Sequence, residues 1–162
     1  MKNSKTRFIV QAAVIAAIYV VLTMVAAALG LSSGAIQIRI SEALTVLPAF
    51  MPAAVPGLFI GCLIANVASG GIFVDVICGS LATLLGAAGT YLLRKHPYLA
   101  PIPPIIANVL IVPFVLAYAY HLDGTIPYFM LTVGIGEVIC CGIFGTVLTT
   151  AILKRGKKTI MK

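Results

Sequence analysis

A single carboxylate, Glu137, lies deep inside the last apolar span of the sequence, within LTVGIGEVICCGIFG. On a helix with a rise of 1.5 Å per residue it would lie about 16 Å from the start of that span. A charged group at such a depth in lipid costs about 2.5–3.5 kcal/mol, so we expect it to face a cavity or a partner. Gly134 and Gly136 leave room beside it for a flat ligand or another helix. The alternative is a structural hydrogen bond to a neighbouring helix, through Asn66 or Asn108.

Three further polar residues interrupt or begin other apolar spans. Asn66 and Asn108 lie inside two of these spans, and Asp75 begins a third. Polar side chains in membranes commonly bond across helices, which is one interpretation of the two asparagines. Together with Glu137, they also offer donors and acceptors that could bind a polar heterocycle.

The segment GAIQIRISEALTVLP, residues 34–48, concentrates polarity in a chain of which only 9% is charged. Apolar and polar residues alternate around Gln37 and Arg39, which predicts an extended segment. Ser41 can then cap the second helix, with Glu42 in its first turn, where the helix dipole favours an anion. One interpretation is an interfacial loop in which Arg39 and Glu42 satisfy each other. The other is an outer lid whose polar side chains face a ligand.

No arrangement of residues indicates catalysis. The sequence has no phosphate loop, no paired-histidine motif and no nucleophile next to a base. The four cysteines lie in apolar spans without metal-ligand spacing, so we expect packing roles and no metal or cofactor. Tyrosines and a histidine gather at the outer ends of the last two spans, which is typical of an interfacial aromatic belt, and stacking on a ligand is the alternative. These residues are Tyr118, Tyr120, His121 and Tyr128.

Composition identifies lipid as the solvent. Hydrophobic residues make up 61% of the 162-residue chain, and the mean hydropathy is +1.14. A soluble domain of this size could not cover so much apolar surface. We expect residues 1–162 to form one integral membrane domain, with no separate ATPase domain. The net charge of +7 comes from basic clusters that flank apolar spans, a pattern of multipass proteins rather than of nucleic-acid binding.

The sequence predicts an all-α membrane protein with six transmembrane helices. The first, fourth, fifth and sixth spans are near or above the roughly 20 residues needed to cross the hydrocarbon core, whereas the second and third are short. Pro48 and Pro52 predict a kink or break in the second. The six expected spans are Phe8–Gly30, Ser41–Ala54, Val55–Gly70, Ile72–Leu93, Pro101–Tyr120 and Ile126–Leu153.

The basic residues predict the orientation. If both termini are cytoplasmic, ten of the eleven Lys and Arg residues lie inside, and only Arg39 lies outside. All four carboxylates then belong to outer loops or outer halves of spans. We therefore expect a protein of the cell membrane with both termini in the cytoplasm.

Small residues form two ridges along the first span. Ala12 and Ala16 are four residues apart, as are Ala13 and Ala17, and this spacing lets helix backbones approach closely. The ridges could pack within the bundle, or they could form a docking face for another subunit.

Five segments resemble the QueT family: IQIRISEALTVLP, then GLFIGCLIANVASGG with VDVICGSLATLLGA, then PPIIANVLIV, and finally VGIGEVI. The family comprises substrate-binding S components of energy-coupling factor (ECF) transporters, implicated in uptake of queuosine precursors. The resemblance implies a six-helix bundle with a site beneath the first outer loop. It also implies that Ala12, Ala13, Ala16 and Ala17 dock onto a transmembrane coupling subunit, which works with two ATPases. VPFVLAYAYH, after the fifth-span motif, departs from the more acidic helix end expected there.

The resemblance suggests a 7-deazaguanine ligand, such as queuine or its cyano or aminomethyl precursors. A buried carboxylate can accept two adjacent N–H groups of such a base, and Glu137 is the first candidate. Asn66 and Asn108 would then read the carbonyl or a ring nitrogen, and Asp75 or Glu42 would meet a cationic amine. The alternatives are an S component for a flavin or pyrimidine-type vitamin, a scaffold protein without a solute, and an autonomous proton-coupled carrier.

Overall fold

The computed structural model describes residues 2–31 and 36–160, and every regular element in them is helical. This confirms the predicted all-α class. The longer elements are α1, α2, α3, α4, α5 and α6, and shorter 3-10 and π-helical segments connect or extend them. In chain order they are α1 (Lys2–Ala28), the 3-10 helix η1 (Ile40–Ala49), α2 (Ala54–Ala68), α3 (Phe73–Leu92), the 3-10 turn η2 (Pro97–Leu99), α4 (Ile102–Tyr118), α5 (Ile126–Glu137), the π-helical segment η3 (Val138–Phe144) and α6 (Gly145–Ile160).

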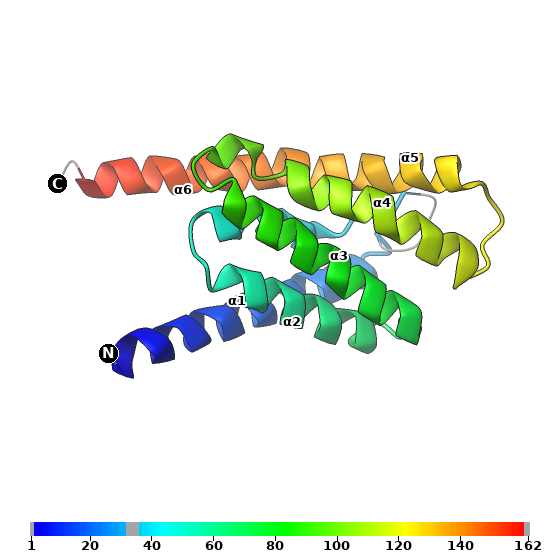
Figure 1. The fold of residues 1–162 in the computed structure, drawn as a ribbon, viewed down its shortest axis with the longest axis horizontal. Coiled ribbons are helices and arrows are strands. Elements are labelled where there is room, and N and C mark those ends of the chain that lie inside the picture. The colour runs from blue at the N-terminus through cyan, green and yellow to red at the C-terminus, as the bar shows by residue number, and fades with distance from the viewer. Residues whose placement is uncertain (1, 32–35, 161–162) are drawn as a thin grey trace.

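Four helical stretches are long and apolar enough to cross a membrane: Ser4–Ala28, Phe73–Leu92, Pro97–Tyr118 and Ile126–Arg155. The last stretch runs through α5, η3 and α6 as one continuous rod (Figure 1). As the sequence predicted, the second and third spans are shorter, because η1 has 10 residues and α2 has 15.

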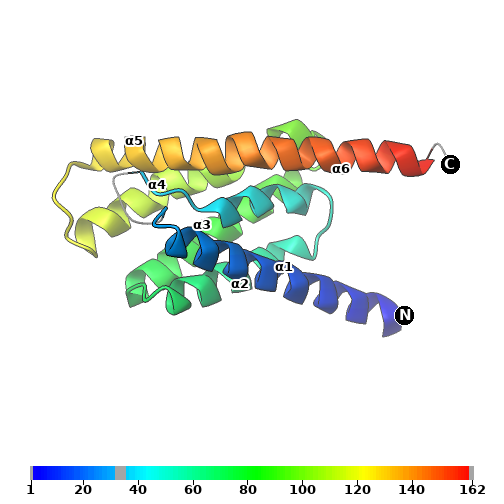
Figure 2. The ribbon, with the colours of Figure 1, turned by 180° about the vertical axis from the view of Figure 1, so that it is seen from behind.

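Both chain ends lie at the same end of the bundle (Figures 1 and 2). That placement agrees with an even number of crossings. The cytoplasmic location of the termini stays a prediction, since it depends on the charge distribution alone.

The second helix differs from its prediction. It is a 3-10 helix that begins at Ile40, with Arg39 at its N-cap position and no side-chain capping bond, so the prediction that Ser41 caps it is wrong. The hydroxyl of Ser41 is fully buried and accepts a hydrogen bond from Thr23 Oγ1 at 2.8 Å. Ser41 therefore joins η1 to α1 instead of capping its own helix.

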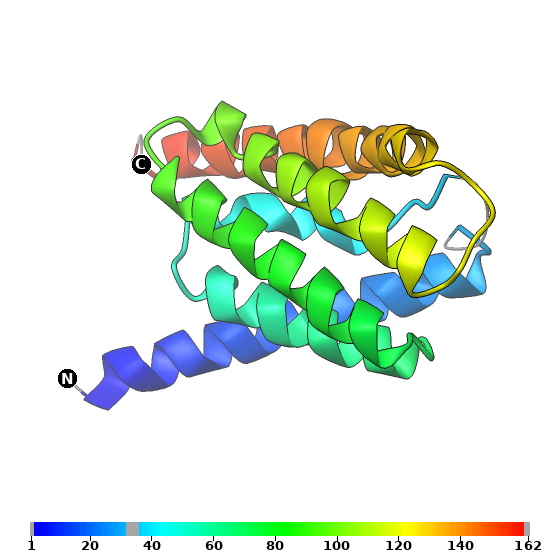
Figure 3. The ribbon, with the colours of Figure 1, turned by 45° about the vertical axis from the view of Figure 1, so that its right-hand side comes forward.

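The short helix η1 occupies the centre of the bundle. It contacts α1, α2, α3, η3 and α6, and it lies between the long rod and the α2–α3 pair in Figure 3. Thr45 and Val46 are fully buried. Because its neighbours enclose it, η1 can lie at membrane depth although it is too short to cross by itself.

The two alanine ridges of α1 have different surroundings. Ala12 and Ala16 are buried against α2, where a Cβ at Gly61 would lie only 3.0 Å from the Ala16 carbonyl oxygen. Ala13 and Ala17 are exposed. Close helix packing within the chain thus already covers Ala12 and Ala16, and the docking role of the four alanines stays a prediction.

A leucine substitution on each ridge tests whether the buried and the exposed ridge differ in their packing. We expect Ala16→Leu to lower the midpoint of thermal unfolding in detergent, because overpacking a close helix contact costs about 1–3 kcal/mol. Ala13→Leu, on the exposed ridge, should leave the midpoint nearly unchanged. Equal melting temperatures for the two variants would contradict the observed packing of α1 on α2.

Candidate functional site

A cavity of about 350 Å³ with several polar side chains on its wall is lined by residues near the end of the bundle opposite the chain termini. Its volume is at the lower end of the range for small-molecule sites. Residues from α1, the segment before η1, α2, α3 and α4, and the turns that follow α2 and α4, line it. They are Thr23, Ala27, Gln37, Arg39, Asn66, Ser69, Gly70, Gly71, Asp75, Val112, Leu116, Tyr120 and Leu122.

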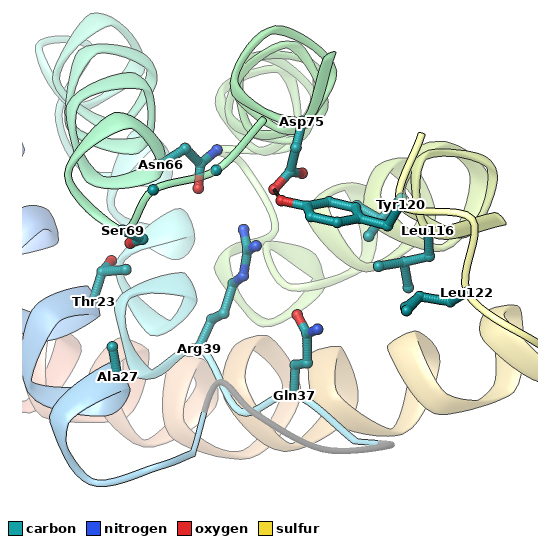
Figure 4. Close-up of a pocket in the computed structure, with 13 residues that line it drawn as sticks. Thr23, Ala27, Gln37, Arg39, Asn66, Ser69, Asp75, Leu116, Tyr120 and Leu122 are labelled. Carbon is teal, nitrogen blue, oxygen red and sulfur yellow. Dashed lines mark hydrogen bonds between the residues drawn. The ribbon is translucent and has the colours of Figure 1, made fainter. Parts of the chain in front are cut away.

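The positive group of this cavity is Arg39. Its guanidinium points into the space between Asn66 and Asp75 (Figure 4). Within the part of the chain that the structure describes, this guanidinium has no hydrogen-bond or ion-pair partner. An arginine presents five donors in a fixed fork, so this side chain is available to bind an acceptor on a ligand.

Asp75 and Asn66 face Arg39 from α3 and α2. Asp75 is 8% exposed, and its Oδ2 accepts a hydrogen bond of 2.9 Å from the hydroxyl of Tyr120. Asn66 is 4% exposed, and its Nδ2 donates to Cys62 Sγ at 3.5 Å. A Cβ at Gly79 would lie 3.1 Å from Asn66 Nδ2, so this glycine makes the room in which the amide sits.

Glu137 and Asn108 line a smaller cavity of about 30 Å³ that shares Gln37, Arg39 and Val112 with the larger one. It has room for about one or two water molecules. Glu137 Oε2 accepts a hydrogen bond of 3.0 Å from Cys141 Sγ. The buried amide Nδ2 of Asn108 has no partner among the described residues. The structure thus brings both side chains next to Arg39, yet not onto the wall of the larger cavity.

Glu42 lines none of these cavities. It is 1% exposed, and Tyr19 donates a hydrogen bond to its Oε1. Its backbone oxygen accepts a bond of 3.4 Å from Cys141 Sγ. No described contact pairs its carboxylate with Arg39. Through these two hydrogen bonds, Glu42 joins η1 to α1 and η3.

The sequence analysis did not identify three polar residues of the cavity wall. Thr23 is a hydroxyl in a largely apolar first span, and Ser69 precedes two glycines at the end of α2. Both features were visible as polar interruptions. Tyr120 was assigned to an interfacial belt, and only the fold shows that its hydroxyl reaches Asp75.

A bundle with several membrane-length apolar helices and a cavity near one end is typical of a multi-pass membrane protein. The model of the QueT transporter family matches residues 9–154, and the chain belongs to that family. The family is described as one of transporters, in agreement with the expectation from the sequence.

A curated relative supports this membership. The queuosine precursor transporter QueT of Lactococcus lactis subsp. cremoris (strain MG1363) is 45% identical over 85 residues. The alignment covers 52% of this chain and 50% of the relative, so the chain matches about half of that protein's length. No solved structure gives a significant match to the chain.

The hydrogen bond between Tyr120 and Asp75 predicts a shifted titration. Partial burial raises the pKa of the Tyr120 hydroxyl, and the hydrogen bond to the Asp75 carboxylate and its negative charge raise it further. Tyr120 should therefore keep its proton above its ordinary range, and Asp75→Asn should lower its pKa. Ultraviolet difference titration of wild type and Asp75→Asn measures this shift, and Tyr120→Phe identifies the signal. An unchanged titration in Asp75→Asn would contradict the contact.

Proposed function

We propose that this chain is the substrate-binding S subunit of an ECF-type importer and captures a queuosine precursor, a 7-deazaguanine, in the larger cavity. One observation carries the proposal: an arginine that has no hydrogen-bond or ion-pair partner among the described residues faces a buried carboxylate in a ligand-sized cavity of a QueT family member. A few convergent polar groups in a largely apolar pocket are typical of small-molecule sites.

The two charges in the cavity complement the edge of the base. A 7-deazaguanine presents N1–H and the exocyclic amine as adjacent donors, and its O6 as an acceptor. Asp75 accepts from the two donors, and Arg39 donates to O6, which gives charge-assisted hydrogen bonds on both sides. Tyr120 fixes the Asp75 carboxylate through Oδ2. An analogue without one of these groups would leave a buried partner unpaired, which provides selectivity.

The remaining predicted residues then have supporting roles. Asn66 and Gln37 lie on the same wall and can bond to the ring or its carbonyl. Glu137 and Asn108 border the water-sized cavity next to Arg39 and Gln37, so we assign them to the orientation of those side chains. Asp75 therefore replaces Glu137 as the proposed acceptor for the base.

Import through an ECF-type complex requires a source of energy. We assign that role to a transmembrane coupling subunit and two ATPases, as the resemblance implied. The exposed ridge of Ala13 and Ala17 is the part of α1 that remains available for docking. With the termini in the cytoplasm, the cavity would open toward the outside.

The binding role of Asp75 can be tested with a neutral isostere. We expect Asp75→Asn to weaken binding of a 7-deazaguanine about ten- to a hundredfold, since hydrogen bonds to charged groups contribute about 1.5–3 kcal/mol. Glu137→Gln, the matched change in the smaller cavity, should weaken binding less. Isothermal titration of purified protein in detergent measures both. A larger loss for Glu137→Gln would move the base to the deeper position and overturn the assignment.

Docking can be separated from capture. Ala13→Leu should leave the affinity of the purified protein unchanged and reduce precursor uptake by cells that also express the coupling subunit and ATPases, because the added side chain disturbs close helix packing. Leu131→Phe, on a lipid-facing position that is 62% exposed, serves as the control for surface bulk. Normal uptake with Ala13→Leu would place the docking face elsewhere.

A further inference from the structure

A second cavity of about 220 Å³ adjoins the one proposed to hold the base. The two cavities share Gln37, Leu116 and Leu122, and Figure 4 shows these three side chains at the wall of the larger one. The other residues that line the second cavity come from α5 and the turn before it. They are Asp123, Tyr128, Phe129, Thr132 and Val133.

The walls of the second cavity suit a group that is partly apolar and partly polar. Leu116 and Phe129 supply buried apolar surface. Thr132 donates its hydroxyl hydrogen to the Phe129 carbonyl at 3.2 Å, which leaves the hydroxyl oxygen able to accept a hydrogen bond. Asp123 is an exposed carboxylate on the same wall, and it can attract a cation.

The orientation of the base directs its substituent toward this cavity. In guanine-type bases, O6 and position 7 lie on the same edge. If Arg39 binds O6, the substituent on position 7 projects from the edge of the base that faces Arg39, and the segment of Arg39 also carries Gln37. Gln37 is the polar side chain of that segment that both cavities share.

The backbone of Gln37 packs closely against α5, whereas no described hydrogen bond holds its side chain in one rotamer. A Cβ at Gly136 would overlap the carbonyl oxygen of Gln37, so the segment sits directly on the surface of α5. The side chain of Gln37 is half-buried and has no hydrogen-bond partner among the described residues. A change of its rotamer would therefore alter the boundary between the cavities without moving the segment.

We infer that the second cavity is a subsite for the position-7 substituent of the base, and that Gln37 is the specificity-determining residue at its entrance. The subsite takes a cationic amine that carries a hydroxylated group, such as the arm of queuine. This inference rests on the proposed function, because the larger cavity must hold the base.

Filling the subsite should affect only the ligand with the long substituent. We expect Thr132→Phe to weaken queuine binding about tenfold or more and to leave the short, neutral 7-cyano base within about twofold. Ile135→Phe, on the lipid-facing side of the same helix, controls for added bulk on α5. Equal losses for both ligands, or no loss for either, would overturn the inference.

A second variant keeps the test valid if Thr132→Phe does not fold. Asp123 is exposed in a turn, so Asp123→Asn should fold normally. It should weaken queuine about threefold relative to the uncharged cyano base, a modest factor because the site is exposed to solvent. An unchanged ratio of the two affinities would contradict the subsite.

Binding of the cyano base and of queuine to the wild-type protein tests the subsite and the proposed function separately. Binding of the cyano base without binding of queuine would overturn the subsite and keep the proposed function. Binding of neither base by folded protein would overturn both.

Discussion

The hydrogen bonds that join η1 to α1, from Tyr19 to Glu42 and from Thr23 to Ser41, determine how this bundle is built. Lipid offers no partners for polar groups, so a short polar helix at membrane depth must find them inside the protein. Glu42 Oε1, Ser41 and Thr45 do so through α1 and η3, whereas the buried Glu42 Oε2 has no hydrogen-bond partner among the described residues. Arg39, one residue before η1, is then held at the edge of this network with its guanidinium free to face the cavity. The same constraint thus accounts for both the central helix and the polar site.

The structural features that depend on composition and on residue spacing could be predicted from the sequence. The all-helical class, the short second and third spans and the concentration of polarity around Gln37 and Arg39 follow from apolar run lengths and from isolated polar residues. The sequence predicted that Glu137 faces a cavity, but not that it lines the smaller cavity instead of the larger one. Spacing gives the depth of a residue along a helix, whereas the π-helical segment directly after Glu137 and the packing of α5 on its neighbours decide its rotation.

Other differences have similar causes. The two alanine ridges of α1 are identical in spacing, and only the position of Gly57 and Gly61 on α2 decides that Ala12 and Ala16 are buried. Ser41 has the residue type of a cap, but a tertiary partner, Thr23, takes its hydroxyl. Local preferences were overridden in both cases by contacts between elements far apart in the chain.

The central claim is that the larger cavity recognises a 7-deazaguanine. Equilibrium binding of the purified wild-type protein to the aminomethyl precursor, in competition with guanine and riboflavin, tests this claim most directly. The account predicts saturable binding of the precursor at one site per chain, weaker competition by guanine, and none by riboflavin. Binding of riboflavin in place of the precursor, by protein that remains folded, would contradict the proposed substrate and leave the helix bundle with a different solute.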